Sequence, residues 1–156
     1  MEEITLEQVI DHYRNRPYMS GIDRDRARVK ATGEVFTPVE TVIKNLNKMD
    51  QKLFADPEQE FWDPTVGDGA FLTEVVIKKM ENGIPFEQAL KKCLGTDLLK
   101  DNCDLCKERL VVGQEHLRPI VNRNIINCDI FKFSGRFDGS PADIFTALFS
   151  DEQKSQ

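Results

Sequence analysis

The stretch from Phe61 to Leu72 constrains the fold more than any other part of the chain. The apolar pair Phe61-Trp62 runs into Asp63-Pro64, and a loop bracketed by Gly67 and Gly69 follows. Apolar residues then recur at helical spacing as far as Met80. This order predicts a strand, a tight turn and a helix, with Asp63 at the carboxyl end of the strand.

The turn is also the first candidate for a ligand site. Glycines at positions 67 and 69 allow positive φ and let the backbone approach a ligand closely. A carboxylate at the end of the strand suits a ligand with a cationic amine and a ribose. The alternative is a glycine turn that only closes the chain. The dinucleotide fingerprint does not fit, because Leu72 occupies its third glycine position.

Upstream, the pattern predicts two helices and a basic loop. Residues 4–15 place apolar side chains on one helical face, and six Arg and Lys residues lie between positions 14 and 30. That basic run is either a solvated segment or a contact for phosphates. Thr37-Pro38-Val39-Glu40 has the form of a capping box and predicts a helix to about Met49, followed by a polar linker over residues 50–60.

Downstream, two more strands ending in acids are expected. A short helix from Phe86 leads to a strand over residues 93–97, which ends at Asp97, and a helix over residues 100–112 follows. After a loop with His116 and Pro119, residues 124–131 look like a third strand that contains Asp129. Each acid has an alternative interpretation as a turn or helix-capping residue.

The four cysteines favour packing over metal binding. Cys103-x-x-Cys106 is one close pair inside an amphipathic helix, whereas a zinc site of four thiolates usually has two such pairs. We expect buried reduced thiols and no metal.

Two motifs together resemble a known family. The pattern Asp63-Pro64-x-x-Gly67-x-Gly69-x-Phe71-Leu72, preceded by residues 33–38 (Gly-Glu-Val-Phe-Thr-Pro), resembles the S-adenosylmethionine-binding half of the adenine-specific DNA methyltransferases. The resemblance covers about residues 29–133 and implies S-adenosylmethionine as the cofactor. It implies cofactor-binding roles for Phe36, Thr37, Pro38, Asp63, Pro64, Gly67, Gly69, Phe71, Asp97, Leu98, Asp129 and Ile130, with Phe131 as an alternative to Ile130 beside the adenine ring.

The chain departs from this family where the chemistry is expected. The family orients the target amine with an Asn/Asp/Ser-Pro-Pro-aromatic motif, and this sequence contains no Pro-Pro pair. Ser140-Pro141-Ala142-Asp143 lacks the second proline and the aromatic ring, so the catalytic residues stay unassigned. Those four residues read as a helix start, and a strand over residues 144–149 is the alternative.

Length and charge complete the expectations. The 156 residues suit one domain with a helical and basic segment over residues 1–30 and a tail over residues 134–156. The expected fold is α/β, a truncated Rossmann-like and mostly parallel sheet, whose unpaired edge needs the tail, a protein partner or a second copy. A net charge of −6 argues against gripping nucleic acid over a broad face, so DNA is expected to be held through another subunit.

No apolar run could span a bilayer and no signal-peptide pattern is present, so a cytoplasmic protein without membrane contact is expected. Two hypotheses follow. The chain binds S-adenosylmethionine and methylates DNA adenine only with a partner, or it is a catalytically inactive methyltransferase-like module for interaction or cofactor binding.

Overall fold

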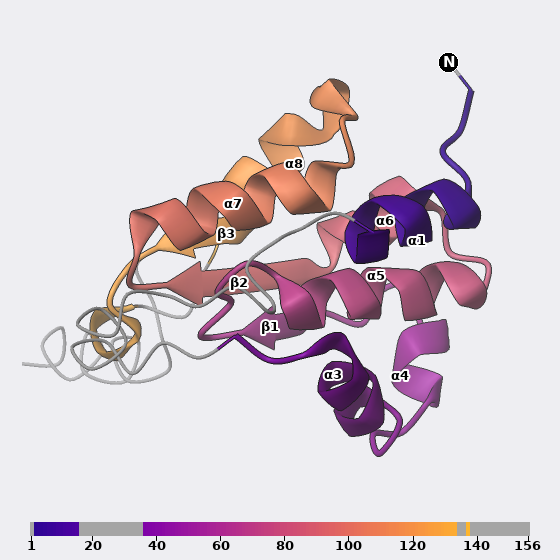
Figure 1. Cartoon of the computed structure of the whole chain (residues 1–156), viewed down its shortest axis with the longest axis horizontal. Coiled ribbons are helices and arrows are strands. Elements are labelled where there is room, and N and C mark those ends of the chain that lie inside the picture. Colours follow the sequence, from indigo (N-terminus) through magenta and orange to yellow (C-terminus); the bar gives the residue numbers. More distant parts are fainter. Residues whose placement is uncertain (1, 16–35, 134–136, 138–156) are drawn as a thin grey trace, which may run out of the picture.

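A three-stranded parallel sheet forms the centre of the protein (Figure 1). The computed structural model describes residues 2–15, 36–133 and 137. The strands are β1 (Phe61–Asp63), β2 (Cys93–Asp97) and β3 (Ile125–Asn127), in the spatial order β1-β2-β3. Phe61 lies opposite Cys93, and Gly95 lies opposite Ile125. Because all three strands are parallel, their carboxyl ends meet at one edge of the sheet.

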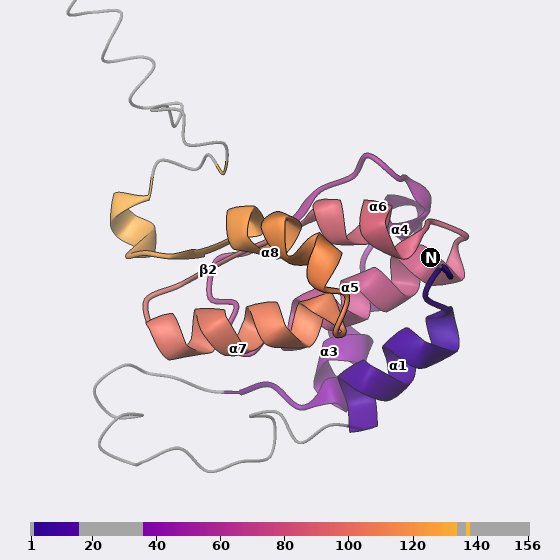
Figure 2. The ribbon, with the colours of Figure 1, turned by 90° about the horizontal axis from the view of Figure 1, so that it is seen from above.

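Helices cover both faces of this sheet (Figure 2). One face carries α5 (Ala70–Glu81) and α7 (Lys100–Val111), which are the two helices that follow β1 and β2. The other face carries α6 (Phe86–Lys91) and α8 (Arg118–Asn124), which precede β2 and β3. Alternation of strands and helices therefore produces three layers, and the expected α/β class is confirmed.

Three further helices surround α5. The N-terminal α1 (Leu6–Asn15) contacts α5 and α7, while α3 (Val39–Leu46) and α4 (Lys52–Ala55) pack against α5 on the side of β1. The core between these elements includes Val9, Val42, Phe54, Val76, Leu110 and Ile125, each at most 1% exposed. Burial of this apolar surface is the main term that stabilises the fold.

Several local expectations are corrected. Pro38, not Thr37, is the N-cap of α3, and no side chain caps that helix, so the capping box is not formed. The expected linker contains α4, and the expected loop around Pro119 contains the 3-10 helix Glu115–Leu117 and α8. The third strand stops at Asn127, and a 3-10 helix (Ile130–Lys132) replaces its expected end. The ends of helices and strands depend on tertiary packing, so the sequence pattern predicts them less well than the elements themselves.

Several expectations fall on residues outside the described ones. They are most of the expected basic loop (residues 16–30), residues 33–35 of the motif that ends at Pro38, and the tail of residues 134–156 apart from Phe137, which includes the Ser140-to-Asp143 motif and the segment after it. Within the described residues, no helix is both long enough and apolar enough to cross a membrane.

Candidate functional site

The glycine loop after β1 lies over the carboxyl end of β2. The Val66 amide donates to the carbonyl oxygen of Thr96 at 2.9 Å, and the Gly67 amide donates to Asp97 Oδ2 at 2.9 Å. Gly67 and Gly69 have φ values of +54° and +87°, which L side chains rarely adopt. The expected strand, glycine turn and helix are therefore present, and the turn is bonded to the neighbouring strand.

The glycines are needed for different reasons. A Cβ at Gly69 would lie only 2.9 Å from Cys106 Sγ. The loop packs so close to α7 at this position that a side chain does not fit without a shift. A Cβ at Gly95 in β2 would lie 2.7 Å from Val66 Cγ2, so this glycine makes room for the loop itself. Packing thus explains Gly69 and Gly95. At Gly67 a Cβ would meet only the Phe36 ring at an ordinary 3.5 Å.

Asp97 joins the loop to the start of α7. Its Oδ2 accepts from Gly67, and its Oδ1 accepts from the Leu99 amide at 2.8 Å and from Asn102 Nδ2 at 3.4 Å. The carboxylate therefore holds the turn before α7. It is half-buried and does not cap the helix, whose N-cap is Leu99 with no side-chain bond, so the alternative interpretation holds only for the turn. A carboxylate has about four lone-pair sites, so Oδ2 still has capacity for one further donor.

Asp63 is half-buried at the same edge. Its Oδ1 accepts from the Thr65 amide at 3.1 Å. Burial is the main cause that raises the pKa of Asp63 above its ordinary value, the Thr65 bond opposes it, and the negative charge of Asp97 raises it further. The two strand-end acids are thus close enough to repel each other, as two carboxylates do in a shared site.

The Phe36-Thr37-Pro38 segment reaches the glycine loop across 30 residues of sequence. The Phe36 ring packs beside Gly67. Pro38 begins α3, and its carbonyl oxygen accepts from the Thr41 and Val42 amides at 3.1 Å each. The structure therefore brings the described part of the first motif, residues 36–38, next to the glycine loop.

The β3 side of the site is less regular than expected. Asp129 does not end the strand but lies two residues beyond it, where its Oδ1 accepts from the Phe131 amide at 3.0 Å. Ile130 is half-buried, while Phe131 is 96% exposed and Leu98, which follows β2, is 63% exposed. Leu98 and Phe131 are therefore two large apolar side chains that stay exposed beyond the ends of β2 and β3.

A groove runs from this edge along β1. It has a volume of about 270 Å³ and lies between β1, α5 and the segment of α3 and its following turn. Of the predicted site residues, Asp63, Pro64 and Phe71 line it. These three residues therefore face the groove between β1, α3 and α5.

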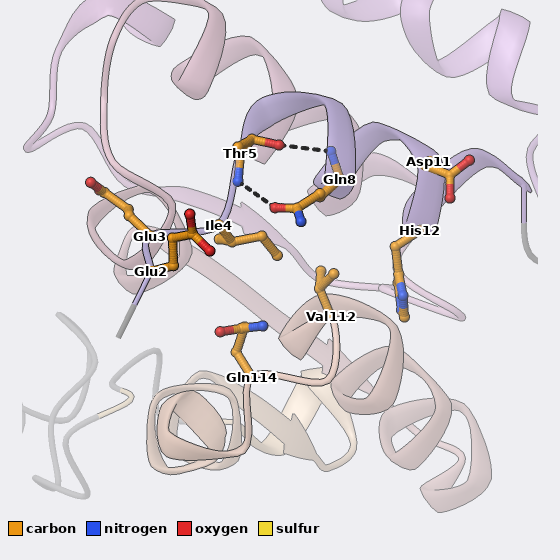
Figure 3. Close-up of a pocket in the computed structure, with 9 residues that line it drawn as sticks. All are labelled: Glu2, Glu3, Ile4, Thr5, Gln8, Asp11, His12, Val112 and Gln114. Carbon is orange, nitrogen blue, oxygen red and sulfur yellow. Dashed lines mark hydrogen bonds between the residues drawn. The ribbon is translucent and has the colours of Figure 1, made fainter.

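A larger cavity lies elsewhere, between the N-terminal segment with α1 and the end of α7 (Figure 3). Its volume is about 450 Å³, and its lining includes Glu2, Glu3, Asp11, Val112 and Gln114. Because α7 starts at the carboxyl end of β2 and runs back along the sheet, its end lies far from the strand-end acids. None of the predicted site residues lines this cavity.

The sequence did not reveal a buried ion pair behind the loop. Arg109 NH1 lies 3.3 Å from Asp68 Oδ2, with both side chains at most 2% exposed, and Arg109 NH2 donates to the Tyr13 carbonyl oxygen at 2.9 Å. The neighbouring Arg14 makes a two-pronged bond to buried Glu74, at 3.0 and 2.7 Å. One signal was available: Arg109 follows Cys106 by three residues and so shares its buried helical face.

A second missed residue is Asn127. Its Nδ2 donates to the carbonyl oxygens of Asp97 and Leu98 at 3.0 and 2.9 Å, which fixes the end of β3 to the end of β2. An asparagine at a strand end has many ordinary roles, so no signal in the sequence distinguishes this one.

The cysteines are free thiols, and Cys93, Cys103 and Cys106 are buried. Burial raises the pKa of Cys93 and of Cys103 to about 12, and it raises the pKa of Cys106 well above its ordinary value. Protonated thiols are poor nucleophiles and poor metal ligands. Among the described residues, no three His, Cys, Asp or Glu side chains gather as a metal site would require.

No protein-family model matches the chain, and neither the curated proteins nor the solved structures contain a match. Its own residues therefore carry the functional argument.

Proposed function

We propose that this chain binds S-adenosylmethionine at the carboxyl ends of β1 and β2, and that it takes part in methyl transfer to DNA adenine when a partner completes the site. The observation that carries the proposal is the convergence on Gly67. Its amide is bonded to Asp97, and its Cα faces the Phe36 ring. Three segments from distant parts of the sequence thus meet where the family resemblance implies a cofactor.

The strand order supports the same proposal. Doubly wound α/β sheets have the order 3-2-1-4-5-6 and bind ligands at the carboxyl ends, where the order reverses beside strand 1. The described sheet has the order β1-β2-β3, and its glycine loop follows β1. We therefore interpret the fold as one half of a Rossmann-like sheet, with β1 at the edge where the order would reverse.

Each predicted residue then has a chemical role. The Asp63 carboxylate would attract the cationic amine of the methionine part, and the remaining capacity of Asp97 Oδ2 would accept from a ribose hydroxyl. Leu98 and either Ile130 or Phe131 would flank the adenine ring, and Asp129 would accept from its amine. Thr37, Pro38 and Gly69 would shape the pocket through backbone. The cofactor would supply a methyl group on a cationic sulfur.

Two observations support dependence on a partner. The sequence lacks the Pro-Pro motif that orients the target amine in this family, and its net charge is −6. In this proposal the partner supplies the group that orients the target amine, and it also binds the DNA. A cytoplasmic location, which the sequence led us to expect, belongs to the same proposal.

The second candidate function is a catalytically inactive module that binds the cofactor or another protein. The missing motif favours it over an enzyme that acts alone. The two candidates differ in a single result, since only the first predicts methyl transfer when a completing partner is added.

Isothermal titration of the full chain with S-adenosylmethionine and with its demethylated product tests cofactor binding. We expect the wild-type chain to bind both ligands. Leu98→Ser should weaken binding roughly tenfold or more, because Leu98 would flank the adenine ring. It should not destabilise the fold, because the Leu98 side chain is exposed. Asp97→Asn should weaken binding as well, through both the ribose and the loop. Asp104→Asn, an exposed acid paired with Lys100 on α7, is the matched control and should bind normally.

The result that would overturn the proposal is equally clear. If the wild-type chain is folded by circular dichroism and binds neither ligand, the cofactor site does not exist. If all variants bind as tightly as the wild type, a ligand is held somewhere other than at the strand ends.

A further inference from the structure

One arginine joins the glycine loop to the N-terminal helix. Arg109 lies in the last turn of α7 and is almost completely buried. One nitrogen of its guanidinium lies 3.3 Å from Asp68 Oδ2 and donates to the Asp68 carbonyl oxygen at 3.5 Å. Another donates to the Tyr13 carbonyl oxygen of α1 at 2.9 Å. Because a guanidinium is planar and rigid, it holds these two groups at a fixed spacing.

The end of α1 is fastened to α5 and α7 by further buried contacts. The Tyr13 hydroxyl donates to the Leu110 carbonyl oxygen of α7 at 2.8 Å, and Arg14 bonds Glu74 of α5 through two nitrogens. Val9 and Tyr13, one helical turn apart, have side chains that are fully buried. The chain before the helix instead lines the cavity of about 450 Å³ (Figure 3). The second half of α1 therefore carries the contacts that reach Arg109.

The glycine loop is held on two sides. The Gly67 amide donates to Asp97 at the end of β2, which is the side of the proposed ligand. The next residue, Asp68, is 1% exposed and meets Arg109 on the side of the helices. Gly67 and Asp68 share one planar peptide unit, so a shift of Asp68 must turn the backbone that begins at Gly67. The position of Arg109 is therefore transmitted to the loop.

We propose that Arg109 is a positioning residue that couples the docking of α1 to the conformation of the glycine loop, so that α1 sets the affinity of the strand-end site. Arg109 would act through Asp68 and not on the ligand itself. The coupling concerns this chain alone, whereas its effect on affinity rests on the proposed cofactor function. Linkage makes the effect reciprocal, so a bound ligand should also slow hydrogen exchange in α1.

Hydrogen–deuterium exchange of the full chain, read by mass spectrometry without ligand, tests the coupling. Val9→Ala/Tyr13→Phe loosens α1 but changes no residue of the loop, α5 or α7. We expect the amides of residues 66–69 to exchange roughly threefold faster or more in this variant. Isothermal titration with S-adenosylmethionine should then show affinity roughly fivefold weaker or more. Tyr13→Phe alone keeps the packing of Val9 and should show the same changes to a smaller extent.

Two variants separate positioning from a general loss of stability. Val121→Ala removes buried methyl groups from α8, on the opposite face of the sheet, and should lower Tm while loop exchange and affinity stay as in the wild type. Arg109→Lys keeps the charge but lacks the planar fork that reaches both partners. In the Arg109→Lys background, Val9→Ala/Tyr13→Phe should therefore change loop exchange less than it does in the wild type.

Three outcomes decide between the claims. If Val9→Ala/Tyr13→Phe changes loop exchange no more than Val121→Ala does, the coupling does not exist, whatever the chain binds. If loop exchange rises but the affinity for S-adenosylmethionine is unchanged, α1 does not set that affinity, and the inference fails. If the wild-type chain binds neither S-adenosylmethionine nor its demethylated product while loop exchange still follows α1, the coupling stands and the proposed function is wrong.

Discussion

Removal of the Arg109 side-chain charge should destabilise the protein more than any change at an exposed arginine. Arg109 lies between Asp68 of the glycine loop, at 3.3 Å, and the Tyr13 carbonyl of α1, at 2.9 Å. Arg109→Met keeps a side chain of similar length but leaves the Asp68 carboxylate buried without this cation. Breaking one partner of a buried pair costs about 3–5 kcal/mol, a large share of the roughly 5–15 kcal/mol that stabilises a typical domain.

The expected loss can be measured by thermal and urea unfolding, followed by circular dichroism. For a chain of this size, each kcal/mol corresponds to about 2–4 °C, so Tm should fall by roughly 6–20 °C. Arg118→Met is the matched control, because Arg118 is more exposed and pairs with Glu115 and Glu108 at the surface. Its loss should stay below about 1 kcal/mol.

A double variant distinguishes the cost of an uncompensated buried charge from the cost of lost side-chain packing. If the loss comes from the uncompensated carboxylate, Arg109→Met/Asp68→Asn should be more stable than Arg109→Met alone, because the buried charge is gone. The reasoning is refuted if the Arg109 and Arg118 variants lose the same stability, or if the double variant is the least stable of the three.

Two further predictions concern the site itself. The folded-state pKa of Asp63 is raised, mainly by burial, so its ionised form costs stability above that pKa and the cost disappears as pH falls below it. Asp63→Asn should therefore keep or raise Tm near neutral pH, and Tm should depend less on pH in the acid range. Cofactor binding should weaken in the same variant. A lower Tm near neutral pH would contradict this reasoning. Gly95→Ala places a Cβ 2.7 Å from Val66 Cγ2 and should cost about 1–3 kcal/mol in urea unfolding, partly recovered by adding Val66→Ala. An unchanged midpoint would mean that the loop moves without cost.

Much of the candidate site could be predicted because its signals are local. The order of apolar residues, proline and glycine in residues 61–72 fixes a strand, a turn with positive φ and a helix, and these steps depend only on neighbouring residues. The same holds for Asp97 at the end of β2. Asp129 was misplaced because the apolar run after Asn124 does not show where the strand stops. β3 ends at Asn127, and the amide of Cys128 still donates to the Asp97 carbonyl oxygen of β2.

The tertiary structure decided which residues that are distant in sequence come into contact. Contacts of Phe36 with Gly67, of Gly95 with Val66 and of Arg109 with Asp68 join residues about 30 to 40 positions apart, and no local period encodes them. The structure also placed β1 at one side of the described three-stranded sheet, beside an apolar groove. Sequence by itself determined the α/β class, the order of the three strands along the chain and the residues of the glycine turn, because backbone preference and periodicity are local properties. Only the packed chain decided that the turn is held by β2 and α7, because that depends on which surfaces fit together once every element is buried.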